Sequence, residues 1–177
     1  MKKLHIAVIF IFLAVGSFGQ GKSNVVKSEV SFKIKNLGFN VGGNFTGFKA
    51  DINFKPENLA ASSIEASVAS NSVNTDNESR DSHLKSDDYF DVEKYPRIIV
   101  KSVSFKHRNG NNYTGSFNVS IKDKTKLVEI PFTYADAGNN AIVKGSFHIL
   151  RTDFGIGGKN LILSNDATVT ISAETNK

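Results

Sequence analysis

Residues 113–121 carry the sequence YTGSFNVSI, in which apolar or small residues alternate with polar ones. Tyr113, Phe117 and Ile121 fall on one parity of this stretch, and Asn118 falls on the other. Successive side chains of a β-strand point to opposite faces, so a period of two predicts a strand with one buried face and one wet face. This pattern sets the fold class, because it recurs along the chain.

The alternation predicts eight strands in all. The apolar positions of the other seven are Val30, Phe32 and Ile34; Phe48, Ala50, Ile52 and Phe54; Ile64, Ala66 and Val68; Ile98 to Phe105; Val128, Ile130 and Phe132; Val143, Gly145, Phe147 and Ile149; and Val169 and Ile171. Asn109-Gly110 is a tight-turn signal between two of these strands. Eight strands joined mostly by hairpins predict an all-β antiparallel fold, and a barrel is favoured over a sandwich because closure removes exposed edges.

Residues 75–95 interrupt the strand pattern, because they are polar and show no period of two. Thr75 or Asp76 can cap a helix, and Glu78 stands three residues beyond Thr75, as a capping box requires. The sequence therefore predicts a short helical insertion between the third and fourth strands. We expect this insertion to cover one end or one side of the barrel.

The N-terminus has the composition of a secretory signal peptide. Two lysines precede an apolar run over residues 4–15, and the small residues Ser17 and Gly19 follow it. A run of this length is too short for a membrane span, which needs roughly 20 apolar residues. We expect a signal peptide over residues 1–19, removed from a single domain over residues 20–177.

The composition restricts the cellular compartments and the binding partners that we expect for this protein. The chain has no cysteine, so it can carry neither a disulfide nor a lipidated cysteine. Its Asn-x-Ser/Thr triplets would suit eukaryotic secretion, but the lack of cysteine favours a bacterial periplasmic or secreted protein. Its 22 basic and 17 acidic side chains are interspersed, which predicts no nucleic-acid partner and at most transient contact with a membrane surface.

The interior leaves two alternatives open. The chain has 14 phenylalanines, and most of those beyond the leader fall on the apolar faces of strands. The interior of an eight-stranded barrel is either just filled by side chains or able to hold one ligand. Small residues at inward positions, namely Ala50, Ala66, Gly115 and Gly145, favour a cavity.

No catalytic or metal centre is predicted. A closed zinc site needs about four ligands, and the histidines beyond the leader are His83, His107 and His148. His83 lies among aspartates such as Asp81 and Asp87, which leaves a metal site there as an open alternative. No nucleophile elbow of the Gly-x-Ser-x-Gly type is present. We expect neither an enzyme nor a cofactor.

Several motifs resemble those of the YceI-like family of periplasmic lipid-binding proteins. They are NSVNT at residues 71–75, RDSHLKSDDYFD at 80–91, Tyr95-Pro96, RTDFGI at 151–156 and VGGNF at 41–45. The resemblance covers nearly all of the predicted mature chain in order. It implies an elongated, lipocalin-like barrel that holds a polyisoprenoid, an isoprenoid quinone or a fatty amide for carriage, storage or stress response.

Strand parity and the resemblance together give a candidate ligand site. Parity places the ligand tail against Phe32, Ile34, Phe48, Ile52, Phe54, Val68, Phe117, Val119, Ile130 and Phe147. The resemblance implies a head group near the helical insertion and the Arg151 loop, with an entrance framed by Tyr89, Phe90 and Phe154. The alternative is a packed structural or partner-binding module without a ligand, and either form could be a homodimer.

Overall fold

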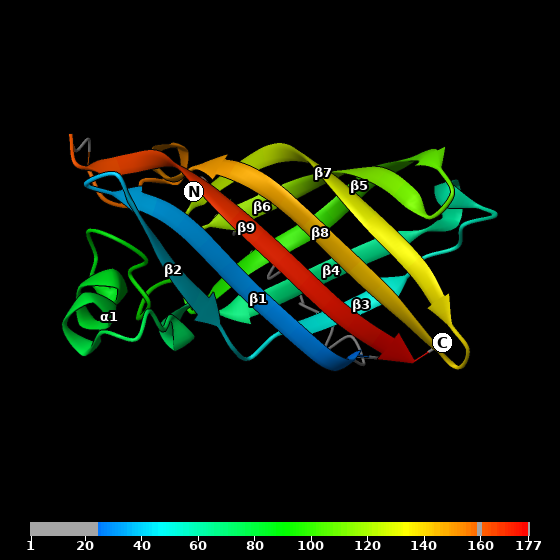
Figure 1. The fold of residues 1–177 in the computed structure, drawn as a ribbon, viewed down its shortest axis with the longest axis horizontal. Coiled ribbons are helices and arrows are strands. Elements are labelled where there is room, and N and C mark those ends of the chain that lie inside the picture. Colours follow the sequence, from blue (N-terminus) through cyan, green and yellow to red (C-terminus); the bar gives the residue numbers. More distant parts are fainter. Residues whose placement is uncertain (1–24, 159–160, 177) are drawn as a thin grey trace, which may run out of the picture.

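The chain folds into one curled antiparallel sheet with a short helix at one end (Figure 1). The computed structural model describes residues 25–158 and 161–176. The strands are β1 (Val25–Asn36), β2 (Phe39–Phe45), β3 (Lys49–Asn53), β4 (Ser63–Ala69), β5 (Arg97–Asn109), β6 (Asn112–Ile121), β7 (Lys124–Ala137), β8 (Asn140–Leu150) and β9 (Leu163–Asn176). The predicted leader lies outside the described residues and stays a prediction.

The sheet order is β2-β1-β9-β8-β7-β6-β5-β4-β3, and every neighbouring pair is antiparallel. Most neighbours are consecutive in sequence, as the hairpin connections predicted. The antiparallel all-β fold is therefore confirmed, whereas the predicted number of eight strands is wrong, because the sheet has nine.

The additional strand is β2, and the turn before it explains why the sequence did not reveal it. Asn36 pairs with Phe39, which leaves Leu37 and Gly38 as a two-residue turn with φ of 51° and 82°. Asn-Gly is the usual signal for such a turn, and Leu-Gly does not provide it. The Gly42-Gly43 pair then weakens the alternating pattern within the strand itself.

The free edge of β2 is covered by the chain that follows β4 rather than by another strand. After the 3-10 helix η2 (Ser70–Ser72), the Asn74 and Asn44 backbones exchange two hydrogen bonds, with N–H to O=C distances of 3.0 and 2.9 Å. The Ala69 N–H also donates to the Thr46 carbonyl at 3.2 Å. Among the described residues, β2 and β3 share no ladder, so the cylinder has a seam between its two edge strands.

The predicted helical insertion is confirmed as α1 (Glu78–Lys85), which lies between β4 and β5 at one end of the sheet (Figure 1). Its N-cap is Asn77, whose side chain accepts from the Arg80 N–H at 2.9 Å, so the predicted caps Thr75 and Asp76 are wrong. Thr75 is buried, and its hydroxyl instead donates to the Asp81 carboxylate. Within the described ranges, no helix has the length and apolar character needed to cross a bilayer.

Aromatic side chains plug the end of the barrel away from α1. The centroid of the Phe54 ring lies 4.9 Å from that of Tyr113, 5.3 Å from that of Phe132 and 5.2 Å from that of Phe105. Each of these ring pairs is close to edge-to-face. Such ring pairs add to the stabilisation from burial alone. The buried members of this aromatic plug are Phe54, Ile64, Tyr113, Phe117, Ile130, Phe132 and Phe147.

The inward glycines serve this packing instead of leaving room for a ligand. A Cβ on Gly115 would collide with the Phe117 ring, and one on Gly145 would lie 3.3 Å from the Ile130 Cγ2. The expectation that Gly115 and Gly145 leave space along the lumen is therefore wrong. Each glycine lets a neighbouring apolar side chain lie flat against the sheet.

The Leu37 backbone gives a test of the β1–β2 hairpin. A leucine at positive φ is strained, and Leu37 is also 66% exposed. We expect Leu37→Asn to raise the free energy of unfolding by about 1 kcal/mol, because asparagine tolerates this conformation. Urea unfolding measures the change. Leu127→Asn is the control, since Leu127 is equally exposed but sits in strand β7, and a similar gain there would contradict the assignment.

Candidate functional site: an apolar cavity beside helix α1

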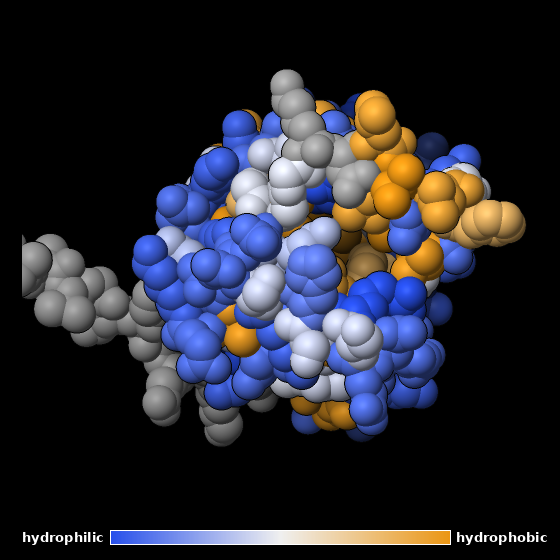
Figure 2. Space-filling model, turned by 90° about the vertical axis from the view of Figure 1, so that its left-hand side faces the viewer, coloured by the Kyte–Doolittle hydropathy of each residue, from blue (hydrophilic) through white to orange (hydrophobic). Residues whose placement is uncertain are grey.

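A cavity of about 300 Å³ lies between the aromatic plug and helix α1. Figure 2 looks onto this end of the molecule, where an apolar recess is visible between hydrophilic side chains. Its apolar lining is made by Val30, Phe32, Ile34, Val41, Phe45, Phe48, Ala66, Val68, Leu84, Phe90, Ile98, Val100, Val119, Ile121, Phe147, Ile149, Ile156, Leu163, Ala167, Val169 and Ile171. The interior is thus filled at one end and hollow at the other.

Strand register explains one wall of the cavity. Phe32 of β1 is opposite Val169 of β9, and Ile34 is opposite Ala167. Directly opposed residues of an antiparallel pair point to the same face, so these four side chains turn inward together. Lys33, which lies between Phe32 and Ile34, points outward and is exposed.

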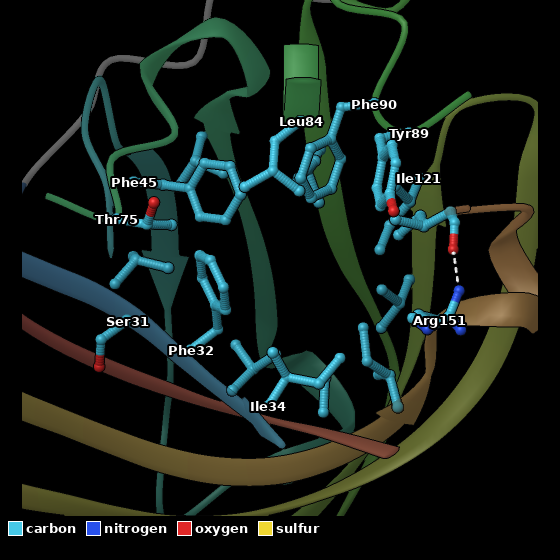
Figure 3. Close-up of a pocket in the computed structure, with 18 of the residues that line it drawn as sticks. Ser31, Phe32, Ile34, Phe45, Thr75, Leu84, Tyr89, Phe90, Ile121 and Arg151 are labelled. Atoms are coloured by element: carbon cyan, nitrogen blue, oxygen red, sulfur yellow. Dashed lines mark hydrogen bonds between the residues drawn. The ribbon is translucent and has the colours of Figure 1, made fainter. Parts of the chain in front are cut away.

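The wall near the seam depends on a glycine. Phe32 is opposite Gly43 of β2, and a Cβ on Gly43 would lie 2.6 Å from the Phe32 ring. The missing side chain therefore lets the ring lie against β2. Phe32 then contacts Phe45 with 5.6 Å between ring centroids, and Phe45 contacts Phe90 edge-to-face at 5.5 Å. Figure 3 shows these three rings along one side of the cavity.

The segment after α1 closes over the cavity and is fixed to the barrel. The Gly157 N–H donates to the Asp88 carbonyl at 2.7 Å, and the Lys122 ammonium donates to the Asp87 carbonyl at 2.8 Å. These bonds hold Tyr89 beside the loop that follows the 3-10 helix η3 (Arg151–Phe154). The segment is therefore bonded to two loops, the one after η3 and the turn between β6 and β7.

Arg151 lies beside the same loop as Tyr89 and is 3% exposed. Its guanidinium donates to the carbonyls of Ser164 at 2.8 Å, Ile156 at 2.8 Å and Gly158 at 2.9 Å, with a longer bond of 3.3 Å to the Leu163 carbonyl. Figure 3 shows Arg151 at the cavity wall, opposite Phe45. The Arg151 side chain therefore fixes the loop before β9, because it donates hydrogen bonds to several backbone carbonyls of that loop.

The structure separates the candidate ligand residues into two groups. Those that line the cavity are Phe32, Ile34, Phe48, Val68, Tyr89, Phe90, Val119, Phe147 and Arg151. Those that do not line it are Ile52, Phe54, Phe117 and Ile130, which pack in or against the aromatic plug, and Phe154, which is buried behind the wall. The alternation along each strand identified which side chains point inward. It did not show whether an inward side chain lies at the plugged end or at the cavity end of the barrel.

Sequence reasoning missed the lining residues that come from β2 and from the insertion. Val41 and Phe45 share a parity with Gly43, so a strand over residues 39–45 would have revealed them. Thr75, Arg80, His83 and Leu84 also line the cavity. No period of two exists in the insertion to show which of its side chains face inward.

The metal alternative gains no support from the part of the chain that the structure describes. No three His, Asp or Glu side chains converge there. His83 instead contacts the Tyr89 ring edge-to-face at 4.8 Å between centroids, and His148 pairs with Asp166 at 2.8 Å on the surface.

Comparisons with known proteins agree with this architecture. The family model described as the YceI-like domain matches residues 22–175. A UPF0312 protein of Pseudomonas paraeruginosa is 31% identical over 170 residues, which cover 88% of each chain.

Solved structures share the fold. BcnA of Burkholderia cenocepacia superposes with a TM-score of 0.82 at 23% identity, over 88% of this chain and 100% of BcnA. A polyisoprenoid-binding domain from Saccharophagus degradans, implicated in plant cell wall breakdown, gives a TM-score of 0.68 at 12% identity, over 88% and 97% of the two chains.

Two adjacent glycines of β2 test the packing of the Phe32 ring. We expect Gly43→Ala to lower the free energy of unfolding by about 1–3 kcal/mol, because the new methyl group would collide with the Phe32 ring and with the Asn74 carbonyl. Gly42→Ala is the matched control, since the nearest atom to its Cβ would be 3.6 Å away. Thermal or urea unfolding of both variants measures the difference. Equal effects would show that Phe32 does not lie against Gly43.

Proposed function

The chain belongs to the YceI-like family, and from this we propose that it is an exported protein that binds one long apolar molecule inside its barrel. The observation that carries the proposal is the cavity of about 300 Å³, with a wall that is mainly apolar. A volume of this order is at the small end of the range typical of small-molecule sites. The alternative of a packed module without a ligand does not account for this space.

The energetics suit a hydrocarbon tail. Burial of each CH2 group contributes about 0.8 kcal/mol, so ten carbons contribute roughly 8 kcal/mol before the cost of ordering the ligand. Polyisoprenoids, isoprenoid quinones and fatty amides all carry such a tail. The likeness to a polyisoprenoid-binding domain supports this ligand class through the shared fold. We propose carriage or storage of the lipid, with no catalytic step and no cofactor.

The rim of the cavity supports ligand exchange at a membrane surface. Leu37 and Phe39 of the β1–β2 hairpin are 66% and 77% exposed, and Ile162 of the adjacent loop is 51% exposed. The Leu37 N–H donates to the Ile162 carbonyl at 2.8 Å, which holds these two loops together. Figure 2 shows apolar side chains gathered beside the recess. We propose a periplasmic or secreted protein that touches membranes transiently.

Ligand binding is tested by filling the cavity. We expect the delipidated protein to take up a C20 prenyl or C16 acyl lipid in native mass spectrometry. Val169→Trp should weaken this binding about ten-fold or more, because Val169 lines the cavity. Thr170→Trp, on the outer face of the same strand, should bind like the unmodified protein. A protein that takes up no prenyl or acyl lipid would contradict the proposed function.

Exchange at a membrane is tested separately. We expect the double variant Leu37→Ser and Phe39→Ser to slow lipid transfer from vesicles several-fold, while affinity for the same lipid in detergent stays unchanged. The control removes two exposed apolar side chains elsewhere, with Val103→Ser and Leu127→Ser. Equal transfer rates for the two double variants would rule out a role for the rim.

A further inference from the structure

The cavity ends at a defined layer of inward side chains. Ala66 of β4 is opposite Val100 of β5, and Val100 is opposite Val119 of β6. All three residues line the cavity. The next inward residues toward the aromatic plug, Ile64 of β4 and Phe117 of β6, belong to the plug and do not line the cavity. Ala66, Val100 and Val119 therefore form the last open layer on this side of the barrel.

Phe117 belongs to the layer that follows. It precedes Val119 by two residues along β6, which is a step of about 7 Å. Phe117 is opposite Ser102 of β5, and the Ser102 hydroxyl accepts from the Ile64 N–H at 2.9 Å. The Phe117 side chain is buried and contacts the Phe105 ring edge-to-face, with 5.8 Å between centroids. One step along the strand thus leads from open space to a packed ring.

The Phe117 ring is held in place from two sides. A Cβ on Gly115 would collide with this ring, so the ring lies directly over the glycine backbone. The same Cβ would lie 3.2 Å from the Phe105 Cδ1, which shows that Phe105 also borders the space above Gly115. Close-packed interiors leave little room for a side chain to move aside. A ligand tail that reaches Phe117 therefore meets a supported surface.

Phe147 of β8 marks the same boundary on another strand. Among the buried members of the aromatic plug in the described chain, Phe147 alone also lines the cavity. It is opposite Val169 of β9, which lines the cavity as well and packs against the plug. The floor of the cavity thus includes the cavity-facing side of Phe147.

We propose that the Phe117 ring, together with Phe147, is the stop that determines how long a tail the cavity takes up, so that the protein selects its lipid by tail length. This inference rests on the proposed function and deepens it. Each CH2 group that enters apolar space adds affinity, whereas a group that would have to displace a packed ring adds none. The inference places no condition on the head group, because the stop lies at the end of the cavity away from α1.

Removal of the ring should lengthen the tail that is accepted. Calorimetry gives dissociation constants for saturated fatty acids from C8 to C20 with the delipidated protein and with Phe117→Ala. For each acid the ratio of the two constants is taken, because the ratio cancels the solubility of the acid. We expect a ratio near one for C8, since the existing cavity already holds a short tail. For the longest acids we expect the variant to bind at least about ten-fold more tightly.

A second variant should act in the opposite direction. Ala66→Leu partly fills the last open layer, so we expect about ten-fold weaker binding of the longest acids and unchanged binding of C8. Phe132→Leu is the control, because Phe132 is opposite Tyr113, four residues from Phe117 along β6, and does not line the cavity. Its ratio should stay near one at every tail length.

The outcomes separate this inference from the proposed function. Geraniol, farnesol and geranylgeraniol repeat the comparison for prenyl tails. Unchanged affinity for the shortest ligands shows that a variant is folded. Where Phe117→Ala does not fold, Phe117→Leu should show the same trend with a smaller amplitude. Ratios that do not vary with tail length in either series would overturn the inference. Failure of the unmodified protein to bind any acid or prenol would instead overturn the proposed function.

Discussion

The edge-to-face packing around Phe54 decides how much of the barrel interior is left open. Phe54 contacts Phe105, Tyr113 and Phe132, and it also lies 4.8 Å from the Tyr134 ring. These rings close one end of the curled sheet with large side chains from different strands. Beyond this plug the inward side chains are mainly aliphatic, and they line the cavity. The cavity is the volume that the plug does not fill.

The same division shows what could be predicted from the sequence. The period of two gave the fold class and the inward faces, because it is a local property of each strand. It assigned Phe54 and Phe32 to one lumen, although one belongs to the plug and the other to the cavity. The position of a side chain along the barrel axis depends on how its strand is aligned with neighbouring strands. The alternation within a single strand contains no information about that alignment. Gly115 was misjudged for a different reason: the ring that occupies its space belongs to Phe117 in the same strand, and alternation gives the face of a side chain but not its rotamer.

The rim was the least predictable part of the site. Strand β2 was missed because the Leu37-Gly38 turn lacks the usual residues, and its lining side chain Phe45 was missed with it. The insertion was located by its polarity and its lack of a period of two, but its cap and its inward residues follow from hydrogen bonds that no local pattern encodes. Arg80 is one such residue, since its orientation depends on Thr75. Arg151 was identified through the family resemblance rather than through periodicity.

The seam between β2 and β3 distinguishes this sheet from a closed cylinder. A closed barrel changes its girth only by breaking a complete ladder or by sliding one strand along another. Here the edges are joined by the Asn44–Asn74 bridge, by the Ala69 N–H bond to Thr46, and by side-chain bonds of Ser72 to Thr46 and of Arg97 to the Gly47 carbonyl. Separation of β2 from β3 would therefore break these contacts but no strand ladder, and the plug around Phe54 lies at the other end of the sheet. The girth of the sheet at this seam is thus set by loop and side-chain contacts rather than by strand pairing.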